Sequence, residues 1–304
     1  MSDAAPRRAR SMPEMGAVFG KMFDPKEVPA SIGGFKPRPT DVVITPFGKC
    51  GTTWLQQTFH TLRTGGDMDF DDISRVVPWI ETSGGLGIDL NAEQKANPRG
   101  FKSHLSYTQV PKGGRYIVAL RDPKDAAVSM YRFMEGWILE PGAVSIGDFI
   151  ATRSAVSKDG GDYWSHLISW WNERDNPNVL VLSYEHMTAQ PAVNIRLVAD
   201  FCGIPLSDDL LALTLERTSL AYMLQFKDRF DDAMMRGLSE RRANIPPGSD
   251  SAKVRKGGVG GHRQELPEQT AQALDATWAS AVTPVLGFAD YASLETELRR
   301  RHAA

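Results

Sequence analysis

The chain has little cysteine. Its 304 residues include two, Cys50 and Cys202, and neither belongs to a Cys-x-x-Cys pair or to a Cys/His cluster with the spacing of metal ligands. A disulfide framework or a structural zinc site needs more of these residues in closer spacing. The sequence therefore supports neither.

Long apolar runs and a strong net charge are also absent. No apolar stretch follows Arg7, Arg8 and Arg10, so we expect neither a signal peptide nor a membrane span, and a cytoplasmic enzyme is the default. The net charge of −2 supplies no global field for a polyanion. We therefore do not expect a nucleic acid polymer as partner, and any nucleotide must be held by local basic residues.

The remaining composition is that of a globular protein. With 41% hydrophobic and 24% charged residues the chain can bury an ordinary core. Residues 1–38, rich in Pro, Ala and Arg, are predicted to form a loosely ordered N-terminal arm, and residues 39–304 one domain. Residues 225–265 combine charged residues, Gly and Met with weak regular structure, which is typical of a lid or binding loop.

Strands and helices alternate along the domain. Residues 41–45, 115–120 and 179–184 are short runs rich in β-branched and aliphatic residues, and each predicts a buried strand. After the first run, Leu55 and Phe59 recur at the spacing of one helix face. The alternation predicts an α/β fold with a mostly parallel central sheet flanked by helices. Ligands of such sheets bind at the carboxyl ends of the strands.

Residues 49–53, Lys-Cys-Gly-Thr-Thr, follow the first strand and open a helix. Backbone N–H groups at a helix start, threonine hydroxyls and a lysine ammonium favour a bound phosphate. The spacing is not that of a Walker A loop, in which the lysine follows the glycines. The alternative is a tight turn with an exposed Lys49. A phosphatase-type loop would carry an arginine soon after Cys50, and none follows, so we interpret Cys50 as a small loop residue.

Arg121 ends the second strand, eight residues before Ser129 on the following helix. A guanidinium can bind a phosphate through two hydrogen bonds, and a serine hydroxyl adds a third. The alternative, equally open, is that Arg121 pairs with Asp122 or Asp125. Two such anion sites together indicate a nucleotide with phosphates at two separate ends.

Three separated motifs now show a resemblance to a known family. Residues 47–54, 121–129 and 255–260 are similar, in this order, to the 5′-phosphosulfate loop, the 3′-phosphate segment and the Arg-Lys-Gly-x-x-Gly loop of the cytosolic sulfotransferases. The resemblance implies a single-domain, P-loop-like sulfotransferase fold. It also implies the donor 3′-phosphoadenosine 5′-phosphosulfate (PAPS) and the product adenosine 3′,5′-bisphosphate (PAP).

The same resemblance assigns the residues that bind the nucleotide. By position, the residues that would hold the 5′ end are Lys49, Cys50, Gly51, Thr52 and Thr53. Those that would hold the 3′-phosphate are Arg121, Ser129, Arg255, Lys256 and Gly257. Those that would contact the adenine are Trp54, Tyr184 and Thr218.

Residues 100–105 resemble the family's Lys-Thr-His-Leu-Pro segment. Lys102 and His104 alternate with Ser103, so in extended backbone both point to one side. A histidine can take the proton of an acceptor hydroxyl, and Lys102 and Lys49 can neutralise charge on the transferring group. We expect these three residues to be catalytic, by in-line displacement and with no metal. The other histidines are interpreted as structural.

The acceptor is expected to be a small, partly apolar hydroxyl or amine compound. Trp79, Phe133 and Trp137 fall near the predicted cleft, as pocket or as core residues. The family's dimer segment is not recognisable in residues 263–267, so its dimer is not assumed. The rival interpretations are a P-loop kinase, which would need Walker A spacing and magnesium, and a catalytically silent binding protein.

Two departures from the family pattern fall in the 5′-phosphosulfate loop. Gly48 replaces a proline and Cys50 replaces a serine, which leaves the rigidity of the loop and one hydroxyl contact open.

Overall fold

Four parallel strands form the centre of the described protein. The computed structural model describes residues 5–157, 159–251 and 253–303. The strands are β1 (Val42–Ile44), β2 (Gly100–Lys102), β3 (Arg115–Leu120) and β4 (Val179–Ser183), and they lie in the order β2-β1-β3-β4. Val42 aligns with Gly100 on one side of β1 and with Arg115 on the other. The predicted α/β fold with a parallel sheet is confirmed.

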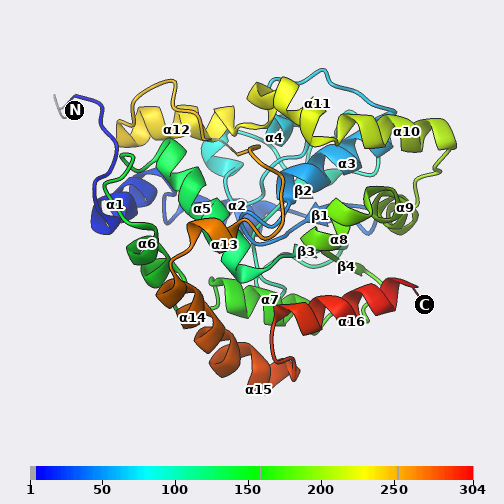
Figure 1. Ribbon diagram of the computed structural model, residues 1–304. Helices are drawn as coiled ribbons and strands as arrows, with labels where there is room; N and C mark the ends of the chain where they lie inside the picture. The colour runs from blue at the N-terminus through cyan, green and yellow to red at the C-terminus, as the bar shows by residue number, and fades with distance from the viewer. Residues whose placement is uncertain (1–4, 158, 252, 304) are drawn as a thin grey trace.

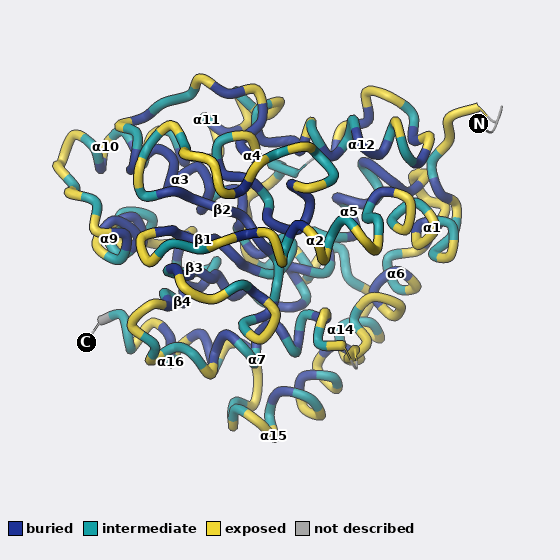
Figure 2. The backbone as a smooth tube through the Cα atoms, turned by 180° about the vertical axis from the view of Figure 1, so that it is seen from behind, coloured by how far each residue is buried: buried dark blue, intermediate teal, exposed yellow. Residues whose placement is uncertain are grey.

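Both faces of the sheet are buried, which explains why its strands are apolar without alternation. Val42 and Ile44 pack with α3 (Thr52–Thr64), α9 (Pro191–Cys202) and α10 (Asp208–Arg217). Val43, between them, faces the other cluster, which includes α7 (Tyr163–Trp171) and α16 (Tyr291–Ala303). Figure 1 shows these two groups of helices on opposite sides of the sheet, and Figure 2 shows the strands as the buried centre.

The remaining helices surround this centre or connect its strands. They are α1 (Met12–Met22), α2 (Glu27–Gly34), α4 (Ile73–Val76), α5 (Pro123–Trp137), α6 (Ile146–Arg153), α8 (Tyr184–Ala189), α11 (Leu220–Gln225), α12 (Ala233–Ala243), α13 (His262–Glu265), α14 (Glu268–Thr277) and α15 (Thr283–Leu286), with the short turns η1 (Gly84–Leu86), η2 (Lys227–Phe230) and η3 (Trp278–Val282).

The strand order reverses at β1. From β1 the chain passes to β2 on one side and then crosses to β3 on the other. Ligands of open α/β sheets bind in the crevice that such a reversal creates beyond the carboxyl ends of the strands. The loops that leave β1, β2 and β3 at this edge carry Lys49, His104 and Arg121.

Local signals start the two helices that face this edge. α5 begins at Pro123, and the carboxylate of Asp122 accepts the N–H of Lys124, as an N-cap does. α3 begins after Gly51, whose φ of 93° lies in the left-handed region that favours glycine. It ends at Gly65, also left-handed.

Two segments that the sequence predicts to have little regular structure contain helices. Residues 1–4 of the predicted loose arm lie outside the described residues, but α1 and α2 follow and pack on the domain, with Met15 and Met22 fully buried. The apolar residues of α1 supply this contact. The segment 225–265 likewise contains an eleven-residue helix, α12, which packs against α1.

A buried ion pair anchors the amino end of β1. Arg99 and Asp41 are 1% and 0% exposed, and Nε and Nη2 of Arg99 donate to the two carboxylate oxygens at 2.9 and 2.6 Å. The same guanidinium donates through Nη1 to the carbonyls of Leu90 and Ala92. The pair therefore ties the segment before β2 to the start of β1.

We expect Arg99→Met to destabilise the fold by about 3–5 kcal/mol, because it leaves the Asp41 carboxylate buried without its partner. Urea unfolding at pH 7 measures this. The matched control is Arg75→Met, which breaks an exposed pair with Asp71 and should cost less than about 1 kcal/mol. Similar losses in both variants would contradict the importance of the buried pair.

Candidate active site

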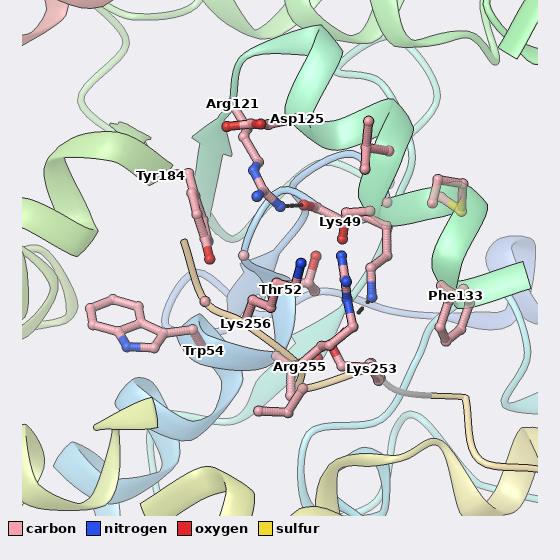
Figure 3. A pocket seen from close by; sticks show the side chains of 18 of the residues that line it. Lys49, Thr52, Trp54, Arg121, Asp125, Phe133, Tyr184, Lys253, Arg255 and Lys256 are labelled. Carbon is pink, nitrogen blue, oxygen red and sulfur yellow. Dashed lines mark hydrogen bonds between the residues drawn. The ribbon is translucent and has the colours of Figure 1, made fainter. Parts of the chain in front are cut away.

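One cavity of about 900 Å³ brings together the residues that the sequence assigned to the site. With one exception, every predicted site residue lines it, and these are Lys49, Gly51, Thr52, Thr53, Trp54, Trp79, Lys102, His104, Arg121, Ser129, Phe133, Trp137, Tyr184, Thr218, Arg255, Lys256 and Gly257. They come from all parts of the chain, and Figure 3 shows how several of them converge.

The exception is Cys50. Its side chain is 1% exposed and does not line the cavity, and its backbone N–H is taken by the carbonyl of Phe47 at 3.1 Å. Burial raises the pKa of its thiol to about 12. Cys50 is therefore a neutral core residue under the loop, and its replacement of a serine removes no hydroxyl from the cavity.

The loop after β1 presents a desolvated lysine. Lys49 has a φ of 69°, its Nζ donates to the carbonyl of Lys253 at 3.3 Å, and it lies 4.4 Å from the centre of the Phe133 ring. Burial, followed by the positive charges of Lys253 and Arg121, lowers the pKa of Lys49 to about 7. An anion bound here would restore the charge of this lysine.

The start of α3 has the features of an anion cradle. A Cβ on Gly51 would lie 3.0 Å from the ring of Tyr184, so the loop passes this ring too closely for a side chain. The hydroxyl of Thr52 is buried and has no hydrogen-bond partner among the described residues. A phosphate at the helix start would supply the missing acceptor, and so these residues fit a 5′-phosphate.

Arg121 links this loop to the loop after α12. It donates to the carbonyl of Lys49 at 2.8 Å and to that of Gly258 at 3.1 Å, and its guanidinium lies 4.1 Å from the centre of the Tyr184 ring. Among the described residues it forms no ion pair, so the alternative pairing with Asp122 or Asp125 is not seen. The Nε atom of Arg121 is buried and has no partner among these residues.

Asp125 fixes the backbone at the end of the third motif, residues 255–260. Its carboxylate accepts the N–H groups of Gly260 and His262 at 2.6 and 3.0 Å and contacts Nδ1 of His262 at 2.9 Å. In the same motif, Arg255 and Lys256 lie 3.8 and 3.3 Å from one carboxylate oxygen of Glu265. The Glu265 carboxylate thus lies beside the two cations, Arg255 and Lys256, that the resemblance assigns to the 3′-phosphate.

Aromatic side chains form one end of the cavity. The indole N–H of Trp54 donates to the carbonyl of Thr218 at 3.0 Å, which fixes the plane of the ring. Figure 3 shows Trp54 and Tyr184 on one side of the basic residues and Phe133 on the other. The flat face of Trp54 suits a purine base.

His104 is held as a neutral imidazole. Nδ1 is 2.7 Å from the carbonyl of Pro46, to which it donates, and the backbone N–H donates to Glu81 at 2.7 Å. The acceptor nitrogen, Nε2, is left for a substrate. Burial, and then the charge of Lys102, lowers the pKa of His104 to about 3, so the ring is neutral at physiological pH.

Lys102 reaches the cavity from the end of β2. The segment at residues 78–80 pairs with it, since the N–H of Lys102 donates to Pro78 and that of Ile80 to Lys102. This pairing places the ring of Trp79 3.9 Å from Nζ. Burial lowers the pKa of Lys102 to about 8, although the charge of Asp232 raises it.

The opposite end of the cavity is apolar. Trp79 and Phe133 line it, and Trp137 both lines it and belongs to the core, with its N–H on Ser239 at 3.1 Å. Sequence reasoning missed Phe19 of α1 and Phe23, its C-cap, whose i, i+4 spacing was the available signal, and also Asp232 and Lys253. Nothing in the sequence connected those two charges.

Comparison with known proteins identifies the family. Residues 39–284 match the family described as Sulfotransferase domain. The chain is 30% identical to Sulfotransferase 1B1 of Canis lupus familiaris over 205 residues, 64% of this chain and 69% of that protein. It is 32% identical to Sulfotransferase 1E1 of Bos taurus over 201 residues, 62% and 68% of the two chains. The chain belongs to the sulfotransferase family, and it is an enzyme of this class.

Solved structures agree in fold. A crystal structure of retinol dehydratase in complex with androsterone and inactive cofactor PAP superposes with a TM-score of 0.70 at 18% identity, over 92% of this chain and 96% of that one. Mouse sulfotransferase SULT7A1 complexed with PAP gives 0.66 at 19% identity, over 91% and 95%.

Two further properties concern metals and membranes. Among the described residues, no group of three or more His, Cys, Asp or Glu side chains is arranged to hold a metal ion. No helix in this part of the chain is long and apolar enough to cross a membrane.

We expect both cysteines to be unreactive in the folded protein, because burial raises the pKa of Cys50 and of Cys202 to about 12. Titration with a chromogenic disulfide reagent at pH 8 should give no fast thiol in buffer and two in denaturant. A fast thiol in buffer that disappears in Cys50→Ala would contradict the assignment of Cys50 as a core residue.

Proposed function

We propose that this sulfotransferase uses PAPS as donor and transfers its sulfuryl group to a hydroxyl or amine of a small, partly apolar acceptor. The observation that carries the proposal is the convergence, in one cavity, of two clusters of cationic residues, aromatic side chains and a neutral histidine. The relatives whose structures were solved with PAP support the choice of nucleotide.

The two ends of the nucleotide are held by different segments in this proposal. Lys49, Gly51, Thr52 and Thr53 hold the 5′ end through the ammonium, the hydroxyls and the N–H groups at the start of α3. The 3′-phosphate is held by Arg121, Ser129, Arg255, Lys256 and Gly257. At Arg255 and Lys256 it replaces the carboxylate of Glu265. Trp54, Tyr184 and Thr218 flank the adenine.

His104 serves as the general base. As the acceptor oxygen forms its bond to sulfur, Nε2 takes the hydroxyl proton, and the bond from sulfur to the 5′-phosphate oxygen breaks on the opposite side. The electron pair of that bond stays on the leaving phosphate, whose charge Lys49 balances, while Lys102 balances charge on the transferring group. The donation of Nδ1–H to Pro46 fixes the tautomer that leaves Nε2 free.

The acceptor enters at the apolar end, between Trp79, Phe133 and Phe23. Phe23 and Trp79 contact edge to face at 6.0 Å, and Trp79 contacts His104 in the same way at 5.2 Å, so an apolar wall leads to the base. Crystal structures of retinol dehydratase contain androsterone or retinol, and both compounds are small and largely apolar. We propose an acceptor of this character.

The function is tested by calorimetry with PAP in the absence of divalent metal and by an acceptor screen with labelled PAPS. The screen should contain phenols, alcohols, amines and sugars. We expect metal-independent binding of PAP and labelling of at least one apolar hydroxyl compound. A preference for Mg-ATP over PAP would favour the kinase interpretation, and PAP binding without any labelled product would favour a silent binding protein.

We expect His104→Gln to lower kcat by about 10²–10⁴-fold while the Kd of PAP changes little, because the variant loses the proton acceptor but keeps both anion sites. Steady-state rates and calorimetry measure the two quantities. His186→Gln, which alters a histidine outside the cavity, is the control and should keep full activity. Unchanged turnover in His104→Gln would show that another group is the base.

Binding of PAP should weaken as the pH rises. Lys49 is charged below its pKa of about 7 and loses this charge above it, while phosphate groups, with a second pKa near 6, stay fully ionised. We expect the Kd of PAP to increase by up to about tenfold per pH unit between pH 7 and 9. Lys49→Met should bind more weakly at pH 6.5 and show a flatter profile, and an equally steep profile in this variant would contradict the assignment.

A further inference from the structure

A buried carboxylate faces the reactive end of the cavity, and it has no counterpart in the motifs discussed so far. Asp232 precedes α12 and is 4% exposed, yet it lines the cavity. One of its carboxylate oxygens lies 2.5 Å from Nζ of Lys253 and 3.6 Å from Nζ of Lys102. Although burial raises the pKa of Asp232, these two lysines lower it well below its usual range.

The backbone of Asp232 is also unusual. Its φ of 50° and ψ of 44° place it in the left-handed region, which is uncommon for residues other than Gly but which Asp adopts more readily than most. Backbone in this region persists where surrounding contacts hold it, and such positions concentrate at functional sites. The contacts here are the two lysines, on β2 and on the loop before Arg255.

Positive charge exceeds negative charge at this end of the cavity. Among the described residues, Asp232 is the carboxylate within ion-pair distance of Lys102 and Lys253, and Lys49 has none. The side chain of Lys253 is 9% exposed, so its charge is also largely removed from water. Among the described residues the three lysines thus have one carboxylate at ion-pair distance, with Asp72 and Glu81 acting on Lys102 from further away, and this leaves a place for an anion.

Lys253 is connected to both anion sites. Its carbonyl accepts the ammonium of Lys49 at 3.3 Å, and it precedes Arg255 by two residues on the same loop. A phosphate that draws Arg255 and Lys256 over the 3′ end therefore also fixes the backbone from which Lys253 extends. Its ammonium lies close enough to Lys49 and Lys102 for its charge to lower the pKa of both lysines.

We propose that Lys253 is a third cation that contacts the transferring sulfuryl group, and that Asp232 is the positioning residue that aims Lys253 and Lys102 at it. The inference rests on the proposed function. The sulfuryl oxygens carry negative charge throughout in-line displacement, and donors fixed in advance around them stabilise the transition state most. The Asp232 carboxylate keeps the ammonium groups of Lys102 and Lys253 close together without filling the space for the sulfuryl group.

The test uses the full-length chain and the variants Lys253→Met, Lys253→Arg and Asp232→Asn. Lys253→Met should lower kcat by about 10–100-fold and change the acceptor KM less than threefold. The Kd of PAP at pH 6.5 should stay within threefold, because PAP lacks the sulfuryl group. Lys253→Arg should recover part of the rate. The control is Lys227→Met, which removes an exposed lysine of the same region, paired with Asp250 at 2.9 Å, and should be neutral.

A pH profile separates this role from a purely structural one. The charged groups that act on Lys49 are Lys253, Asp232, Arg121 and Lys102, from four different segments. Lys253→Met removes a positive neighbour, so the loss of PAP affinity should begin at higher pH than in the parent protein. Asp232→Asn removes a negative neighbour, so the loss should begin at lower pH. Shifts of opposite sign are the expected result.

Several outcomes would overturn the inference while the proposed function stands. The first is an unchanged kcat in Lys253→Met, and the second is that the pH profiles of the two variants do not shift in opposite directions. The third is that Lys253→Met raises KM only for acceptors that carry a carboxylate, which would make Lys253 an acceptor-recognition residue. If the wild-type chain binds PAP but labels no acceptor, the proposed function fails, and the pH profiles still decide whether Lys253 and Asp232 act on this site.

Discussion

The guanidinium of Arg121 joins three segments that are far apart in the sequence. It donates to the carbonyls of Lys49 and Gly258 and lies over the ring of Tyr184. Because its hydrogen bonds go to backbone oxygens and not to a carboxylate, it keeps its positive charge available to a ligand. The loop after β1, the loop after α12 and the start of α8 are placed relative to one another by this one side chain.

Desolvation sets the chemistry of the site. Burial lowers the pKa of Lys49 to about 7, of Lys102 to about 8 and of His104 to about 3, so each group is easier to deprotonate than in water. An anion that enters stabilises the charged form of both lysines, whereas the histidine stays neutral. Burial thus favours anion binding at the two lysines and keeps the histidine neutral, so that it can take the proton of a hydroxyl.

Much of this arrangement could be predicted from short stretches of sequence. The strand before Lys49, the Asp122 cap and Pro123 at the start of α5 are local features, and the structure has them where the pattern placed them. The helices of the N-terminal segment could not be predicted as part of the domain, because α1 is stabilised by packing on α12 more than 200 residues later. Cys50 was placed in the binding set by its position in a motif, and the structure turns it into the core.

The sequence by itself determined three of the four strands, their alternation with helices, and the family, since each depends on residues close together in the chain. The tertiary structure alone decided which charges meet. Asp232 pairs with Lys102 across more than 100 residues and also with Lys253, and Glu265 reaches Arg255 and Lys256 through the turn of a short helix. Contacts between distant side chains depend on how loops cross the edge of the sheet, and no local pattern records that path.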